Sequence, residues 1–292
     1  MIQQIEYLNF PNCLEISNGA ARLVISTDFG PRVLFYGLTG GENILGFQPD
    51  AKVETRLGEW RAYGGHRLWA APENMPLSYA PDNEPVEYFI ENDFSVRLFQ
   101  PLETATGTQK EIIVSLNENG SGATVEHRIT NYGKKRIELA AWALTIMREG
   151  GVCIIPNEDF KPYGTETLLP VRNLTLWSYT NLTDSRWRFE TDSIRLRVDE
   201  NRQTPQKIGV LNRKGWAAYA RENLLFVKRF DFVENASYPD MNSNTEIYTS
   251  GGFVELESLS PLQKLGASES IIYTERWQLL ENVGVEELIK ND

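Results

Sequence analysis

The apolar positions of this chain repeat mainly at every second residue, which is the period of a β-strand with one buried face. The runs at 21–27 (ARLVIST) and 123–130 (ATVEHRIT) are typical, and turn-forming residues separate such runs along the chain. A helical spacing is limited to Val285–Lys290, with a further turn inside residues 66–75. The alternation predicts strands over residues 21–27, 32–36, 86–90, 94–99, 110–116, 123–130, 137–146, 194–198, 207–211, 216–220, 224–230, 253–259 and 270–279.

Many strands, few helices and an even composition are typical of an all-β protein built as one large antiparallel sandwich. No internal repeat and no linker-like stretch divides the 292 residues. Because large sandwiches reach this length as single units, we expect residues 1–292 to form one domain.

The charge balance narrows the range of partners. The chain has 29 Lys or Arg and 40 Asp or Glu residues, which gives a formal net charge of −11. Nucleic acids and anionic membranes bind basic surfaces, so neither is an expected partner. The N-terminal residues show no leader pattern, and no apolar stretch has the length of a membrane-spanning helix. We expect a cytoplasmic protein, and the sequence leaves its oligomeric state open.

Histidine and cysteine are scarce in this chain. The histidines are His66 and His127, and the cysteines are Cys13 and Cys153. Their separation excludes the usual zinc-binding spacings and favours reduced thiols, and we expect neither a metal nor another cofactor. Loop carboxylates such as Asp240 leave bound calcium as an open alternative. His127 lies in an alternating apolar strand and is expected in the core, so His66 is the remaining candidate for histidine chemistry.

The densest polar and aromatic cluster follows Gly64 and Gly65 and contains His66, Arg67 and Trp69. The glycines permit a positive φ and a close approach of the backbone to a ligand. His and Arg side chains bind sugar hydroxyls or phosphate, and Trp offers a flat face to a sugar ring. We expect His66 and Arg67 at a ligand site, with a structural ion pair as the alternative for Arg67. For Trp69, a core position is an equally good interpretation.

Glu255 and Glu257 are two residues apart on a predicted strand, so both side chains point to one face. Two such carboxylates repel each other, and the pKa of one of them should rise unless a cation lies between them. This arrangement is typical of a cleft floor, and an exposed face with two hydrated acids is the alternative. Lys228 and Arg229 lie on another predicted strand that could flank the same cleft, and they would matter if the ligand were phosphorylated. Exposed cations on that strand are the plainer alternative.

Three segments resemble the galactose mutarotase-like superfamily, which includes the aldose 1-epimerases. They are residues 18–45 with an Asn-x-Leu loop at 43–45, residues 63–73 (YGGHRLWAAPE), and residues 253–279 with FVELES and a late Trp. The middle segment is similar to the hexose-6-phosphate epimerase branch and closer to a branch with a Gly-Gly-His-Arg-Leu-Trp motif. The resemblance implies a β-supersandwich that binds a small-molecule carbohydrate.

The resemblance also implies roles for individual residues. Glu257 matches the catalytic base, and Glu255 would then bind sugar hydroxyls or an arginine. Asp240 precedes the glutamate strand and Arg61 precedes the Gly-Gly segment, where the superfamily carries residues that contact the sugar. A simple turn residue after proline is the alternative for Asp240. Trp142 lies on the strand where the superfamily carries its catalytic histidine, and it is expected to line the cleft.

One residue of the superfamily pattern is missing. In the aldose 1-epimerases, a catalytic histidine follows a Thr-Asn-x-Gly turn, whereas here the strand after the turn at 130–133 contains none. We therefore expect a sugar 1-epimerase variant in which His66 is the substitute acid opposite the base Glu257. The alternative is a module that binds a saccharide or a sugar acid without turning it over. Chemistry on polysaccharide chains is a third option, which the lack of appended domains disfavours.

Overall fold

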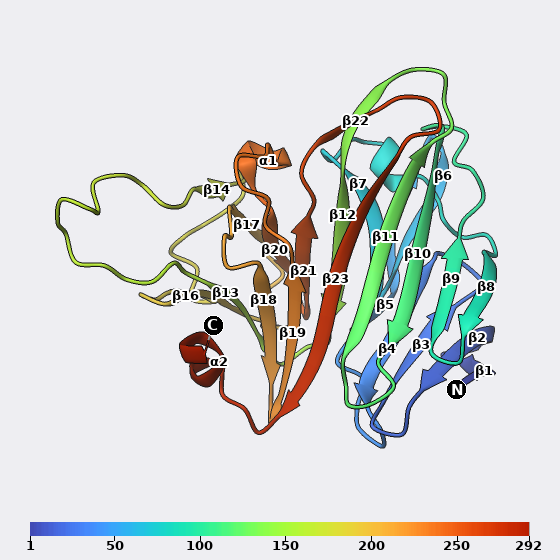
Figure 1. Ribbon diagram of the computed structural model, residues 1–292, viewed down its shortest axis with the longest axis horizontal. Helices are drawn as coiled ribbons and strands as arrows, with labels where there is room; N and C mark the ends of the chain where they lie inside the picture. The colour runs from blue at the N-terminus through green and yellow to red at the C-terminus, as the bar shows by residue number, and fades with distance from the viewer. Residues whose placement is uncertain (292) are drawn as a thin grey trace.

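The computed structural model describes residues 1–291. Two large antiparallel sheets pack face to face, and a two-stranded sheet lies outside them (Figure 1). In spatial order, the larger sheet consists of β1 (Ile2–Tyr7), β2 (Phe10–Ser17), β3 (Ala21–Ser26), β4 (Arg32–Leu38), β7 (His66–Ala71), β12 (Ile137–Met147), β21 (Phe253–Leu259), β20 (Thr245–Ser250), β17 (Gln206–Val210) and β14 (Leu174–Leu176), with β22 (Gln263–Leu265) paired to β12.

The second sheet lies in front of the first in Figure 1, where β23 and β11 cross over β12 and β7. The two-stranded sheet pairs β5 (Phe47–Thr55) with β6 (Gly58–Gly64). The helical elements are the 3-10 turn η1 (Leu77–Tyr79), α1 (Pro239–Asn242) and α2 (Val285–Asn291). In spatial order, the second sheet consists of β15 (Trp187–Phe189), β16 (Ser193–Arg197), β13 (Val152–Pro156), β18 (Trp216–Arg221), β19 (Leu224–Phe230), β23 (Ser270–Glu281), β11 (Ala123–Asn131), β10 (Thr108–Leu116), β9 (Ser95–Phe99) and β8 (Glu87–Asn92).

The main apolar core lies between the two large sheets. Strand β11 shows the alternation that the sequence predicts, because every second residue, such as Val125 and Ile129, is buried and the residues between are partly exposed. Burial of such a row against the facing sheet provides the main driving force for the sandwich. No helix among residues 1–291 is long and apolar enough to cross a membrane.

The central strand β12 is buried on both faces, and this arrangement forms the site. Ala141 and Ala143 point into the main core, whereas Trp142 and Leu144 point to the outer face of the larger sheet. There they join a second apolar cluster that includes Trp60 of β6. The β5–β6 hairpin therefore covers the outer face of the larger sheet rather than extending either large sheet.

The structure confirms the all-β class, the antiparallel sheets, each of the predicted strands to within two residues at each end, and the C-terminal helix. It corrects the expected turn inside residues 66–75, because His66–Ala71 form the central strand β7. The glycines before β7 have positive φ, 103° at Gly64 and 69° at Gly65. A Cβ atom on Gly65 would lie 2.1 Å from the carbonyl oxygen of Val33. Gly65 thus allows β7 to approach the backbone of β4, and a Cβ on Gly64 would lie 2.3 Å from the carbonyl oxygen of Gly46. The conformation of both glycines is explained without a ligand.

Candidate functional site

A cavity of about 350 Å³ opens on the outer face of the larger sheet, and we call it the cleft. Its floor is formed by side chains of β7, β12, β17, β20 and β21, and its cover by β5, β6 and residues around η1. This volume is in the range of natural small-molecule sites. An adjoining space of about 390 Å³ shares Tyr79, Trp142 and Lys207 with the cleft and reaches Asp240.

Aromatic rings form much of the cleft wall. The ring centroids of Trp69 and Trp142 are 5.3 Å apart, and Tyr79 lies 5.0 Å from Trp69 and 5.1 Å from Trp60. The pairs of Trp69 with Trp142 and with Tyr79 are edge-on, and all these aromatic residues line the cavity. Apolar faces of this kind stack on the C–H groups of sugar rings, while polar groups nearby bind the hydroxyls.

Glu255 supplies a carboxyl group to the cleft. The residue lies on β21, and Glu255 Oε1 is 3.7 Å from Arg67 Nη2. Burial raises the pKa of Glu255 to about 7, and the nearby carboxylate of Glu257 adds to this rise while Arg67 opposes it. A carboxyl group with a pKa near neutrality can both accept and donate a proton at physiological pH.

Lys207 connects three buried groups under the cleft. Its Nζ lies 2.8 Å from Glu246 Oε2 and 3.1 Å from Glu257 Oε2. Trp142 Nε1 donates a hydrogen bond of 2.7 Å to the same oxygen of Glu257. Burial would lower the pKa of Lys207, but the two glutamates raise it well above its ordinary value. Burial and the neighbouring Glu257 hold the pKa of Glu246 well above its usual range, and the ammonium of Lys207 opposes this rise.

The structure brings several of the expected site residues together. Arg67, Trp69, Trp142 and Glu255 line the cleft, and Asp240 lines the adjoining space. Arg67 and Trp69 are two residues apart on β7, and they pair across strands with Leu144 and Trp142 of β12. Their common face follows directly from the period of a strand.

Three of the expected site residues, Glu257, Arg61 and His66, are placed differently. Glu257 points to the cleft side but is fully buried beneath Lys207 and Trp142 rather than in the cleft wall. Arg61 is a correction: it alternates with Trp60 and Ala62, which line the cleft, so its side chain leaves the opposite face of β6 and pairs with Glu59 at 2.5 Å.

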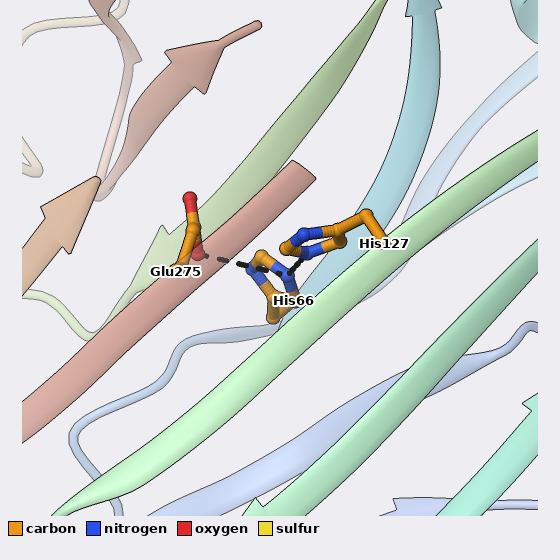
Figure 2. A group of neighbouring side chains, drawn as sticks. All are labelled: His66, His127 and Glu275. Carbon is orange, nitrogen blue, oxygen red and sulfur yellow. Dashed lines mark hydrogen bonds and ion pairs between the residues drawn. The ribbon is translucent and has the colours of Figure 1, made fainter. Parts of the chain in front are cut away.

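His66 is the main correction to the sequence-based site. On β7 its neighbour Arg67 faces the cleft, so His66 faces the space between the two large sheets, where it is fully buried. Its Nε2 lies 2.7 Å from Nε2 of His127 (Figure 2). Its Nδ1 lies 2.9 Å from the hydroxyl of Thr145. The sheet itself separates His66 from Glu257, and His66 cannot act across a sugar from that residue.

The hydrogen bonds of the histidine pair define its protonation. His127 Nδ1 lies 2.9 Å from the carbonyl oxygen of Tyr273 and must donate a hydrogen bond to it, so in the neutral ring Nε2 accepts a hydrogen bond from His66 Nε2. The Nδ1 of His66 then accepts from Thr145. Burial lowers the pKa of both histidines, and for His66 the proximity of His127 and Lys228 lowers it further. The pair is thus a neutral, closed hydrogen-bond chain.

Glu275 completes this internal cluster and bears on its capacity for a metal. The potential ligand atoms of His66, His127 and Glu275 lie within 4.8 Å of one another, as in a three-ligand site (Figure 2). However, Glu275 already pairs with the ammonium of Lys228 at 2.9 Å and accepts a hydrogen bond from Trp277. A divalent cation beside that ammonium would add uncompensated buried charge, so the donor set does not suit a metal. Lys228 itself therefore lies between the sheets and does not flank the cleft.

The sequence did not anticipate three residues that line the cleft, namely Trp60, Tyr79 and Lys207, nor Glu246, which is buried beneath it. One feature of the sequence pointed towards Lys207. Two carboxylates on one face of a strand, Glu255 and Glu257, are stabilised by a nearby cation, but the sequence pattern does not identify which Lys or Arg supplies it. Lys207 lies at the start of a predicted strand and reaches the glutamates only because β17 and β20 follow β21 in the sheet. Strand order is a tertiary property that alternation does not encode.

Comparisons with known proteins bear on the fold. No family model matches this sequence, and no curated protein matches it. Solved structures do: a galactose mutarotase-like protein from Lactobacillus casei has a TM-score of 0.62 at 10% identity, covering 92% of this chain and 100% of its own. A galactose mutarotase related enzyme from Lactobacillus acidophilus has a TM-score of 0.58 at 8% identity, with 93% and 98% covered.

A third match, a galactose mutarotase-like protein from Clostridium acetobutylicum, has a TM-score of 0.54 at 12% identity and covers 96% of this chain and 98% of its own. At such low identity the likeness concerns the fold alone. The chain has the galactose mutarotase-like fold, as the three sequence segments predicted.

Proposed function

We propose that the cleft binds a small carbohydrate. The observation that carries this proposal is the convergence of aromatic faces, from Trp69 and Trp142, with charged hydrogen-bonding groups, from Arg67, Glu255 and Lys207, in one cavity of about 350 Å³. Sugar rings offer apolar C–H faces and a rim of hydroxyls, so both kinds of group are used by one ligand. The fold is the same as that of proteins described as galactose mutarotase-like, which agrees with this ligand class.

We further propose that the cleft catalyses the exchange of sugar anomers. That reaction needs a base for the anomeric hydroxyl proton and an acid for the ring oxygen. Glu255 fits a proton-transferring role because it lines the cleft and has a pKa of about 7. Glu257, the base that the sequence resemblance suggests, remains the competing assignment, and from its buried position it would act on the sugar through movement of Trp142 or Lys207.

The second candidate is binding without turnover. It is favoured by one observation: both histidines of the chain lie between the sheets, so the cleft contains no imidazole to serve as the acid. An ammonium such as Lys207, whose pKa is raised well above its ordinary value, is a weak proton donor at neutral pH. In this case the carboxyl groups of the cleft only bind hydroxyls.

Exchange spectroscopy by NMR tests both candidates. The rate of anomer exchange in glucose, galactose and a hexuronic acid is measured with the wild-type protein and with the variants Glu255→Gln and Glu257→Gln. Glu118→Gln, on an exposed turn, is the matched control. Acceleration that Glu255→Gln abolishes supports Glu255, and acceleration that only Glu257→Gln abolishes supports Glu257. Ligand binding without acceleration selects the binding module.

A further inference from the structure

Arg67 carries a buried charge with few partners at the cleft wall. The residue is 3% exposed, and its guanidinium carbon lies 4.2 Å from the ring centroid of Trp69 and 4.6 Å from that of Trp60. Its Nε and Nη1 are buried and form no hydrogen bond, and the contact of Nη2 with Glu255 Oε1 is 3.7 Å long. A buried guanidinium with unfilled donors is costly unless a ligand satisfies them.

A second arginine increases that cost. Strand β4 runs antiparallel to β7 and pairs Val33 with His66, which places Arg32 directly opposite Arg67. Like charges in such a cross-strand position repel each other. Arg32 is balanced by Asp82, whose Oδ2 lies 2.8 Å from Arg32 Nη2. Burial and the neighbouring Arg32 together lower the pKa of Arg67 to about 10.

The other cation of the cleft is already compensated. Lys207 is held between Glu246 and Glu257 at hydrogen-bonding distances. Glu255, the potential counterion of Arg67, has a pKa of about 7 and therefore carries only part of a negative charge at neutral pH. Of the two cations, Arg67 is therefore the one that lacks a close and fully charged counterion, and a bound anion would supply it.

We propose that the carbohydrate bound in the cleft is a sugar acid whose carboxylate pairs with Arg67. The inference rests on the proposed carbohydrate-binding function and specifies its ligand class. A carboxylate is planar and accepts two parallel hydrogen bonds from one edge of a guanidinium. It matches a guanidinium that lies between two indole rings. A phosphate group is tetrahedral and carries up to two charges, and it would meet stronger repulsion from Glu73 and Glu255, which line the same cavity.

Calorimetric titration of the wild-type protein tests this inference first. The ligands are D-glucuronate and D-galacturonate, the neutral parents D-glucose and D-galactose, and glucose 6-phosphate, all at neutral pH and low salt. We expect one uronate to bind at least about tenfold more tightly than its neutral parent and than the sugar phosphate, because a charge-assisted bidentate pair adds to the affinity.

The variant Arg67→Gln locates the effect. It should remove most of the advantage of the uronate over the neutral sugar, so that the ratio of the two affinities falls towards one, whatever the change in the affinity for the neutral sugar. Arg97→Gln is the matched control, since Arg97 lies on β9 in the other sheet and pairs with Glu111 at 2.9 Å. If Arg67→Gln does not fold, the wild-type comparison of uronate with neutral sugar still decides whether the ligand is a sugar acid.

The outcomes separate this inference from the proposed function. Equal or tighter binding of a neutral sugar overturns the sugar-acid assignment and leaves carbohydrate binding intact. Tighter binding of glucose 6-phosphate overturns the carboxylate in favour of a phosphate. Absence of binding by every sugar contradicts both the inference and the proposed function.

Discussion

Lys207 and Glu257 form a buried ion pair beneath the cleft, with Lys207 Nζ 3.1 Å from Glu257 Oε2. Glu257 is fully buried and Lys207 nearly so. Trp142 donates a hydrogen bond to the same carboxylate and lines the cleft, so the ion pair fixes one aromatic wall of the site. The charge of the cleft floor and the position of its wall therefore depend on one interaction.

Replacement of Lys207 by Met should destabilise the protein by about 3–5 kcal/mol, because it leaves Glu257 and Glu246 buried without a cation. Urea unfolding measures the change in the free energy of unfolding. The control is Lys214→Met, since Lys214 pairs with the exposed Asp159 and its loss should cost less than about 1 kcal/mol. Equal losses in the two variants would contradict the assigned role of Lys207.

Glu255 should make stability fall as the pH rises towards neutrality. Burial raises its pKa from 4.5 to about 7, so the folded state holds this proton more tightly than the unfolded state. The resulting stabilisation is complete below about pH 4.5 and is lost as the pH rises through 7, a difference of roughly 3 kcal/mol. The melting temperature of Glu255→Gln should therefore depend less on pH over this range than that of the wild type, while Glu118→Gln should follow the wild type.

The histidine pair makes stability depend on pH in the opposite direction to Glu255. Burial lowers the pKa of His66 and of His127, so the folded state binds fewer protons than the unfolded state below the ordinary value of 6.5. The stabilisation that comes from the two neutral histidines is complete above pH 6.5. It decreases as the pH falls, by up to about 1.4 kcal/mol per pH unit for each histidine. Nitrogen-15 NMR of the two imidazoles should show neutral rings at pH 5.5, and a charged ring in the folded protein at that pH would disprove the closed chain.

Gly65 should tolerate alanine poorly. Its φ is 69°, and a Cβ there would lie 2.1 Å from the carbonyl oxygen of Val33, a rigid backbone atom. Gly40 is the matched control, because its φ is 76° and a Cβ would meet nothing within 4 Å. Chemical unfolding should show that Gly65→Ala loses at least about 2 kcal/mol and Gly40→Ala about 1 kcal/mol. Similar losses would mean that backbone strain alone, and not the approach of β7 to β4, explains the glycine.

The strands and their faces could be predicted where alternation was regular. Strand β11 is an example, and the common face of Glu255 and Glu257 is another. Strand β7 was missed, because both of its faces are buried and its residues show no alternation. If the segment formed a turn, as the sequence suggested, the side chain of His66 could face the cleft. In a strand, His66 and Arg67 must point to opposite faces of the sheet.

The rest of the site could not be predicted because it depends on sheet order and on the cover. Lys207 and Glu246 reach Glu257 through the neighbouring strands β17 and β20, and Trp60 comes from a hairpin that folds over the sheet. A single domain over residues 1–292 and a cytoplasmic location stay predictions.

Calorimetric titration of monosaccharides and hexuronic acids into the wild-type protein and two aromatic variants tests the central claim most directly. The variants are Trp69→Ala, in the cleft wall, and Phe89→Ala, an exposed ring on the opposite sheet, with folding of both verified by circular dichroism. We expect saturable binding by the wild type and by Phe89→Ala, and a loss of about threefold to tenfold in affinity for Trp69→Ala. Absence of binding by the wild type, or equal affinity in the two variants, would contradict a carbohydrate site in the cleft.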